Sequence, residues 1–272
     1  MRYPAASGVF LLAAALALPA PAQDGGTPVP AAPAAPSFRL SSTETQTTAG
    51  VTTGVTVHRV FRSRTLPSDA KSTSRLEITL TRVHGKLTGP YGDRAFDTAD
   101  EDLSRGIPRN AARWMSMVGH PLALNFDERG RLVGVSGLTE RAISFGLTEK
   151  ACVSDFEALF LPAPPADQKP GSSWTWSRDV LAGGVSARLD IEIPSTAIRE
   201  TQTPVDVDST GSLVGEAVRS SRCRLVVADW RRGDLPRRLE FHCEASIEIP
   251  RRSGEGKVPS AVTADVEFVG IE

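Results

Sequence analysis

The sequence contains few aromatic residues and has almost no net charge. Aromatic side chains make up 6% of the chain, which disfavours an exposed platform for stacking sugars or bases. The chain has 31 Lys and Arg against 32 Asp and Glu, a formal charge of -1, and therefore lacks the basic field that nucleic acid binding requires. The charge balance therefore indicates no particular partner, and we do not expect nucleic acid as a partner.

The motifs of common active sites are missing as well. There is no P-loop and no GxGxxG, and Gly134–Gly137 lacks the GxSxG order of a nucleophile elbow. The histidines show neither HxH nor HExxH spacing and do not neighbour the cysteines, which favours scattered surface or strand positions over a zinc site. These histidines are His58, His84, His120 and His242. No nucleophile, base and orienting group can be assembled, so we expect no enzyme, no metal and no cofactor.

The N-terminus has the pattern of a secretory signal. Met1 and Arg2 precede an apolar run from Val9 to Leu18, and Ala20-Pro21-Ala22 has the small-x-small order that signal peptidase cleaves. The run is shorter than the roughly 20 apolar residues of a transmembrane helix. We therefore interpret residues 1–22 as a signal peptide, and expect an exported, periplasmic or extracellular product with no integral membrane segment after its removal.

Composition divides the remainder into two parts. Residues 23–40 are rich in Pro and Ala and predict a flexible linker that buries no core. Residues 41–272 predict one domain, because about 230 residues lie within the range of a single all-β fold.

Short runs with alternating apolar residues dominate this domain. The clearest are Leu76–Thr81 and Val185–Ile193, which predict half-buried strands. Residues 43–65 predict a single first strand, 91–110 a long loop, and 111–118 a strand. We expect a mainly β fold: a curved antiparallel sheet, or half-barrel, of about nine strands.

One helical insertion interrupts the strands. Residues 121–137 predict a β-hairpin, and the block that follows, to Leu161, has helical character. Thr139 predicts the start of a first short helix, Ser154 or Asp155 the start of a second, and Gly146 a break between them. A sheet with one apolar face needs a cover, so we expect these helices to pack on its concave face.

Two of the three cysteines lie in a predicted hairpin centred on Gly233. In this hairpin, facing residues have numbers that sum to 466, which places Cys223 opposite Cys243. The same register pairs Leu225 with Phe241, so one arrangement accounts for an apolar face and both cysteines. We expect a Cys223–Cys243 disulfide, with two reduced buried cysteines as the alternative. Cys152 is left over and is better explained as a core residue than as a nucleophile.

Three elements carry a resemblance to a known family. They are the hairpin LNFDERGRLVGVSGL (Leu124–Leu138), the helical block behind it, and the pattern LP(x)8-G-x-x-W from Leu161 to Trp174. Together they resemble a family of exported bacterial proteins of unknown function, in which an hxhDxxGxhxxhxG hairpin precedes two helices and an LP...GxxW return. The layout is also similar to the LolA/LppX-like half-barrel, whose known members hold acyl chains in the concavity. This sequence departs from that pattern because it has no long helix ahead of the first strand.

Two functions are compatible with these features. The first is an exported, non-enzymatic binding module that holds a lipid or another apolar small molecule between sheet and helices. The alternative is a structural or protein-interaction component of the bacterial cell envelope, with an envelope protein as partner and a filled core. For the binding module we expect the cavity to be lined by aromatic side chains, namely Phe145, Phe156, Phe160, Trp174 and Trp176.

Overall fold

The computed structural model divides into two units, Met1–Ala34 and Ala35–Glu272. The residues described are 36–66, 75–100, 109–127, 131–157, 159–160, 172–194, 205–230, 235–251 and 256–271. They all belong to the second unit. The predicted signal peptide and most of the predicted linker therefore lie outside the described residues.

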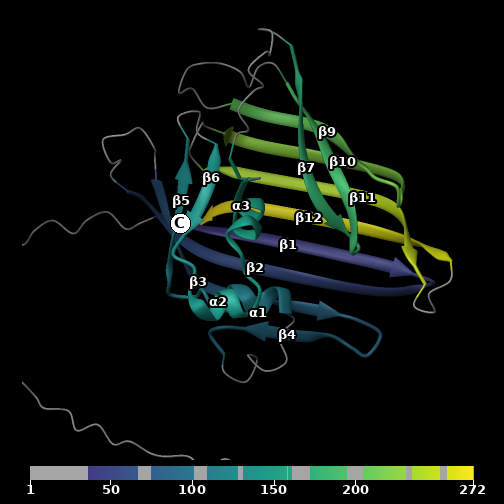
Figure 1. Cartoon of the computed structure of the whole chain (residues 1–272), viewed down its shortest axis with the longest axis horizontal. Helices are drawn as coiled ribbons and strands as arrows, with labels where there is room; N and C mark the ends of the chain where they lie inside the picture. Colours follow the sequence, from purple (N-terminus) through teal and green to yellow (C-terminus); the bar gives the residue numbers. More distant parts are fainter. Residues whose placement is uncertain are drawn as a thin grey trace, which may run out of the picture. The chain divides into compact units, whose positions relative to one another are not determined.

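One antiparallel sheet contains twelve strands in the described part of the chain (Figure 1). Their bounds are β1 (Ser37–Thr48), β2 (Val51–Leu66), β3 (Arg75–Thr88), β4 (Arg94–Asp97), β5 (Pro121–Phe126), β6 (Leu132–Ser136), β7 (Trp174–Ala182), β8 (Val185–Ile193), β9 (Val205–Val214), β10 (Val218–Trp230), β11 (Arg238–Pro250) and β12 (Lys257–Ile271). The order is β6-β5-β3-β2-β1-β12-β11-β10-β9-β8-β7, with β4 paired to β3 beside this path. The predicted fold class is confirmed, but the predicted count of nine strands was too low.

One missing strand, β1, has little apolar alternation. Residues 43–65 form parts of two strands, because Ala49 and Gly50 adopt positive φ and turn the chain between β1 and β2. β1 begins at Ser37, within the range expected of the linker, and its SSTETQTT run gives no hydrophobic pattern. Hydroxyl pairs bridge it to its neighbours instead, with Thr43 and Thr56 oxygens 3.1 Å apart. Threonine's β-branched side chain suits such a strand although it is polar.

Two further strands were absent from the predictions. β4 lies inside the segment predicted to be a long loop, and its Asp97 accepts a hydrogen bond of 3.0 Å from Arg82 of β3. β9 includes Gly211, which lets the backbone of β8 approach so closely that an added Cβ would meet the Asp190 oxygen at 2.4 Å. β4 has only four residues, and Gly211 interrupts the apolar alternation of β9.

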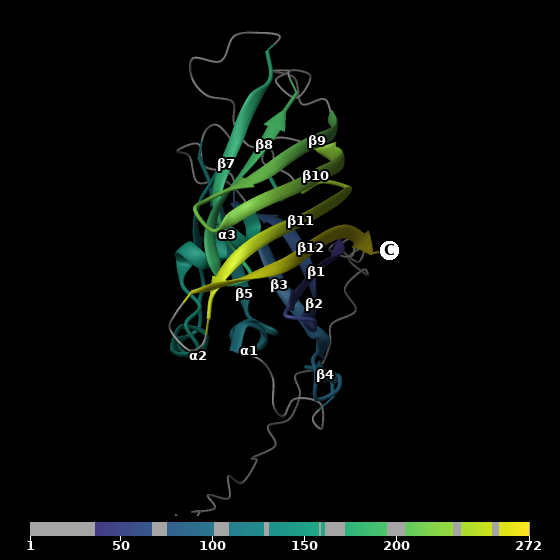
Figure 2. The ribbon, with the colours of Figure 1, turned by 90° about the vertical axis from the view of Figure 1, so that its right-hand side faces the viewer.

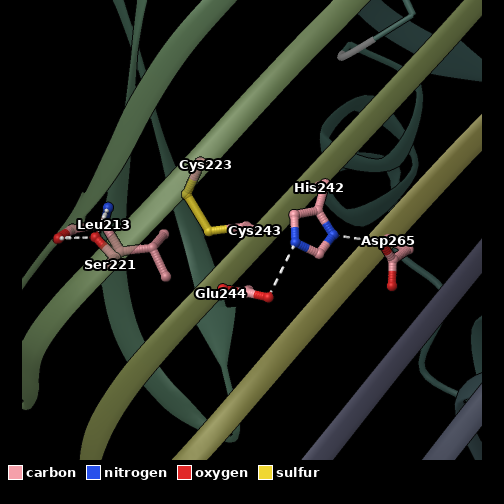
Figure 3. The surroundings of a disulfide bond; sticks show 7 residues. All are labelled: Leu213, Ser221, Cys223, His242, Cys243, Glu244 and Asp265. Atoms are coloured by element: carbon pink, nitrogen blue, oxygen red, sulfur yellow. Dashed lines mark hydrogen bonds and ion pairs between the residues drawn. A yellow bond between two sulfur atoms is a disulfide. The ribbon is translucent and has the colours of Figure 1, made fainter.

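The hairpin of β10 and β11 has the predicted register. Cys223 pairs with Cys243 and Leu225 with Phe241, and a disulfide joins the two cysteines (Figure 3). Both cysteines are buried on the apolar face. The opposite face carries His242, which lies between the carboxylates of Asp265 and Glu244.

Three short helices lie in the described residues: α1 (Arg109–Met115), α2 (Glu140–Ser144) and α3 (Glu149–Glu157). The strand predicted for 111–118 was wrong. Trp114 and Met117 are three residues apart, and both are buried on one side of the α1 turn. None of the described helices has the length and apolar character of a membrane-spanning helix.

The first predicted helix start is confirmed and the second was wrong. Thr139 caps α2 by accepting a hydrogen bond from the Ala142 amide. α3 begins at Glu149 rather than near Ser154, and Thr148 accepts from the Ala151 amide in the same way. Gly146, at φ 84°, separates the two helices as expected. The capping sequence Gly-Leu-Thr-Glu occurs before both helices, and that repeat was the overlooked evidence.

The sheet curves so that its β7–β8 end faces its own middle. Figures 1 and 2 show β7 and α3 on the same side of the sheet, with β7 crossing over β10, β11 and β12. Gly183, in the turn between β7 and β8, lies against Ile247 of β11 and Val262 of β12. The strand curvature thus produces a concave face with a hairpin folded over part of it.

Candidate functional site

A cavity of about 1070 Å³ opens on the concave face of the sheet. β1, β2, β11 and β12 supply one wall, and β7 and β8 supply the facing wall. Ala151, Ser154, Asp155 and Leu159 of the α3 region lie along one side. This volume is on the scale of known ligand pockets, which run to roughly 1,000 Å³.

The inner walls of the cavity are mostly apolar. Strand alternation points these residues inward, because successive side chains lie on opposite faces. The principal apolar lining residues are Leu40, Val55, Val57, Val180, Leu189, Leu213, Leu225, Leu239, Phe241, Val262 and Val266. Small residues, Ala187, Ala245 and Ala264, leave room between them. The concave face therefore exposes apolar surface, and its side chains leave the cavity open.

Four arginines line the same cavity. Arg188 is held by Asp190, and we refer to the other three, Arg59, Arg113 and Arg178, as the arginine cluster. Arg59 of β2 has an 11% exposed side chain, and its Nη1 lies 3.3 Å from Asp155 Oδ2. Arg113 of α1 reaches the same oxygen through Nη2 at 3.5 Å. The Arg59 guanidinium also stacks over Trp114, with its Cζ 5.1 Å from the ring centroid.

Arg178 of β7 completes the cluster from the facing wall. Its Cζ lies 5.9 Å from the ring of Trp176, which also lines the cavity. Burial lowers the pKa of Arg178, while Glu157 and Asp155 oppose that shift through their charge. Burial likewise lowers the pKa of Arg59, against the attraction of Asp155. The Nε atoms of Arg59, Arg113 and Arg178 are buried, and the described structure gives them no hydrogen-bond partner.

The five aromatic residues predicted to line a cavity occupy different positions. Trp176 lines it. Phe156, Phe160 and Trp174 are buried in the core and are not among its lining residues; Phe156, for example, packs edge-on against Trp114 with ring centroids 5.5 Å apart. Phe145 is 37% exposed at the end of α2 and lies outside the lining.

The arginine cluster was missed by sequence reasoning, although the sequence contained a usable signal. Arg59 follows Val55 and Val57 in the inward phase of β2, and Arg178 follows Trp174 and Trp176 in the inward phase of β7. A charged residue in the apolar phase of a strand is either buried or functional. Arg113 gave no such signal. It lies on α1, whereas residues 111–118 were predicted to form a strand.

Cys152 is fully buried in α3, as expected of a core residue. Burial, with the charge of Asp155, raises the pKa of its thiol to about 12, so it is not a thiolate at neutral pH.

His58 and His84 lie on strands, as expected, but they form a pair and are not scattered. His58 and His84 face each other across β2 and β3, with ring centroids 4.8 Å apart. His58 Nδ1 also shares a hydrogen bond of 2.8 Å with the Ser41 hydroxyl. Ser41 and His58 line a second cavity of about 500 Å³, together with His242 and Asp265.

The fold and the cavity define the chain as a mainly β protein with one large, open antiparallel sheet. No protein-family model matches the sequence, and no curated protein matches it. A lipovitellin structure that describes lipid–protein interactions is similar at a TM-score of 0.48 and 9% identity, covering 88% of this chain and 25% of that chain. This chain thus spans about a quarter of that lipovitellin chain. A DUF1329 family protein from Desulfovibrio piger is similar at a TM-score of 0.18 and 9% identity, covering 87% of this chain and 86% of that one. Both likenesses are too distant to carry an argument about function.

Proposed function

We propose that this protein is an exported binding module that holds one apolar or amphipathic chain between its sheet and α3. The observation that carries the proposal is the cavity of about 1070 Å³ with its apolar walls. Apolar surface in contact with water is unfavourable by about 25 cal/mol per Å². A chain that displaced water from these walls would gain that free energy, and a cavity open to solvent would let it enter.

The same cavity weighs against a structural envelope component with a filled core. Ala187, Ala245 and Ala264 lie where larger residues would close the space. A protein selected only for stability gains from such closure, because interiors are ordinarily packed as densely as organic crystals. The space is therefore better explained by a ligand.

Export is part of the proposal. The Cys223–Cys243 disulfide favours an oxidising compartment, since disulfides are rare in the cytosol. The signal-like pattern of residues 1–22 also supports export. A carrier outside the cytoplasm would meet lipid shed from, or in transit between, membranes.

Trp114 and Trp176 line the cavity and allow a direct test by fluorescence. A palmitate with a brominated chain should quench tryptophan emission with one saturable site. Native mass spectrometry of gently purified protein should show a co-purified mass that organic extraction removes. Absence of both signals would reject the proposal.

A matched pair of variants locates the site. Ala264 lines the cavity, whereas Ala261 of the same strand is exposed. Ala264→Phe should fill the space and weaken quenching by about tenfold or more, the loss expected when a ligand must give up one to two kcal/mol of contacts. Ala261→Phe should bind as the parent does. Equal binding by both variants would place the ligand elsewhere.

A further inference from the structure

We propose that the arginine cluster receives the anionic head group of a single-chain lipid whose tail lies along the apolar walls. This inference rests on the proposed function and adds the chemical class of the ligand. The shared chemistry is a compact anion, either a carboxylate or a phosphate, on one saturated or unsaturated chain.

The arginine cluster has few carboxylate partners. Asp155 is the carboxylate that pairs with the cluster, and it serves both Arg59 and Arg113 through one oxygen, Oδ2. Glu157 acts on Arg178 only through its longer-range charge. Arg178 has no ion pair or hydrogen bond among the described residues, although other carboxylates line the cavity elsewhere. An anion bound here would give Arg178 a partner.

Burial makes the lack of partners significant. A cation held away from water without a partner is unfavourable, and proteins ordinarily pair it or keep it hydrated. The Nε–H groups of Arg59, Arg113 and Arg178 are buried donors that have no acceptor among the described residues. Trp114 and Trp176 each lie against one guanidinium and hold it in place. Fixed guanidinium donors suit a carboxylate or phosphate, which accepts two parallel hydrogen bonds from one arginine.

The register of the strands places the arginine cluster at one end of the cavity. β1 and β2 pair Leu40 with Arg59 and Glu44 with Val55, so Arg59 and Val55 lie four residues apart. On the facing wall Gly183 donates to Glu44, which places the β7–β8 turn above the Val55 end. Arg178 lies four residues before Ala182, toward the Arg59 end. Val57 and Val180 line the roughly 13 Å between the ends. The walls therefore match a ligand with one charged end and an apolar tail.

The experiment compares three ligands that share a sixteen-carbon chain: palmitate, hexadecyl phosphate and hexadecanol. Binding is measured by displacement of brominated palmitate from tryptophan quenching. The two anions should bind the parent protein about tenfold or more tighter than the alcohol, the effect of one charge-assisted interaction. Whichever anion binds tighter identifies the head group. Inorganic phosphate alone, at millimolar concentration, should not displace the probe, because it lacks the tail.

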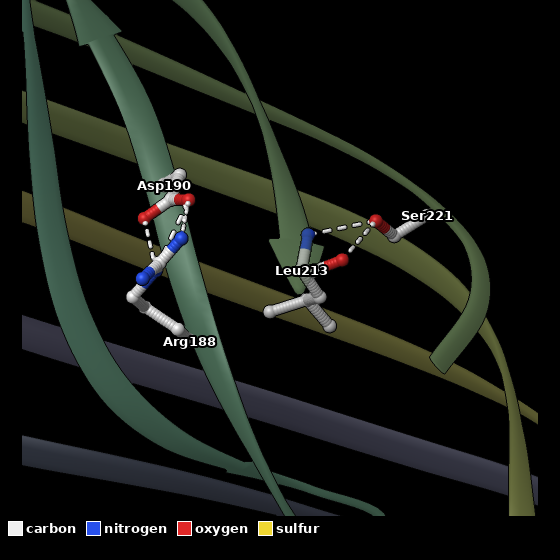
Figure 4. Close-up of polar contacts among 4 residues, drawn as sticks. All are labelled: Arg188, Asp190, Leu213 and Ser221. Carbon is white, nitrogen blue, oxygen red and sulfur yellow. Dashed lines mark hydrogen bonds and ion pairs between the residues drawn. The ribbon is translucent and has the colours of Figure 1, made fainter. Parts of the chain in front are cut away.

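Variants then assign the preference to the cluster. Arg178→Gln removes the guanidinium that lacks a partner and should reduce the anion preference to near that of the alcohol, with hexadecanol binding unchanged. Arg178→Lys should restore part of it. Arg188 lines the cavity and is held by Asp190 (Figure 4), so it does not serve as a control. Arg219→Gln of β10 is the control, since Arg219 is exposed, is held by Glu248 and lies outside the cavity lining. It should bind as the parent does.

The outcomes separate the two proposals. Equal binding of the anions and the alcohol would overturn the head-group site and leave the apolar carrier standing. An anion preference that survives both Arg178→Gln and Arg113→Gln would also overturn it. Failure of all three ligands would reject the carrier itself. Displacement by inorganic phosphate alone would point to a free-anion site instead of a lipid site.

Discussion

Gly183 donates its backbone N–H to the Glu44 carboxylate at 3.1 Å, although 139 residues separate them. Gly183 lies in the turn of the β7–β8 hairpin, at the edge of the sheet order, while Glu44 lies on β1 in its centre. The contact therefore closes the end of the cavity away from the arginine cluster by fixing a peripheral hairpin to the middle of the same sheet.

Replacing Glu44 by Ala should loosen the hairpin without unfolding the sheet. The Gly183 amide loses a charged acceptor, an interaction worth about 1.5–3 kcal/mol at most. Amide hydrogen exchange of β7 and β8 should accelerate, while exchange of β11 and β12 stays near that of the parent. Bound brominated palmitate should dissociate faster. Glu44→Gln retains an acceptor and should behave more like the parent; unchanged exchange in Glu44→Ala would show that the hairpin is held by packing alone.

Adjacent glycines in this turn allow a second test of the same closure. Gly183 and Gly184 both have positive φ, 55° and 84°, so alanine strains either position. An added Cβ at Gly183 would also meet Ile247 Cδ1 at 2.7 Å and Val262 Cγ2 at 2.8 Å, whereas at Gly184 it meets nothing within 4 Å. Gly183→Ala should therefore be less stable than Gly184→Ala by about 1–3 kcal/mol, the cost of overpacking. Urea unfolding of both variants measures the difference, and equal stabilities would contradict the contact.

The sequence allowed the local features with strict periodicity to be predicted. The β10–β11 register followed from one arithmetic rule, because a one-residue slip would turn Cys223, Leu225 and Val227 outward together. Thr139 was recognised as a helix cap. In contrast, β1 is built on threonine pairs, and α1 contains the Trp and Met that also suit a strand. These elements are determined by their neighbours rather than by their own pattern.

The candidate site was less predictable than the fold, for a physical reason. Aromatic residues were expected to line a cavity, yet Phe156 and Phe160 fill the core beneath α3. The cavity is instead bounded by medium-sized aliphatic residues on strands that meet only after the sheet curves. Arg59 and Arg178 are 119 positions apart in the chain, and their convergence depends on that curvature. No local pattern encodes it.

The Cys223–Cys243 disulfide should contribute about 3 kcal/mol to the free energy of unfolding, because it closes a loop of about 20 residues in the unfolded chain. Chemical denaturation with and without reductant should show a loss near this value. A Cys223→Ser/Cys243→Ser double variant should match the reduced protein and no longer respond to reductant. Cys152→Ala is the control, since that variant keeps the bridge and should still lose stability on reduction.

The pH dependence of stability should contain two opposing histidine contributions. Burial, followed by the charges of His58 and Arg82, lowers the pKa of His84 below its ordinary value of 6.5 against the pull of Asp97. Burial and Arg39 lower that of His58, against Glu267. The hydrogen bond that His242 donates to the Asp265 carboxylate raises the pKa of His242, and Glu244 adds to this shift. Folding therefore disfavours protonation of His58 and His84, and it favours protonation of His242.

The signs follow from which state binds more protons. For His58 and His84 the unfolded chain binds protons more readily, so stability falls as pH drops from about 6.5 through their lowered pKa values. For His242 the folded chain binds the proton more readily, so its contribution is complete below 6.5 and is lost as pH rises through its raised pKa. His84→Asn should therefore reduce the loss of stability between pH 7 and pH 5, while His242→Asn should enlarge it. Urea unfolding at both pH values measures each change, and parallel profiles for the two variants would contradict the opposite signs.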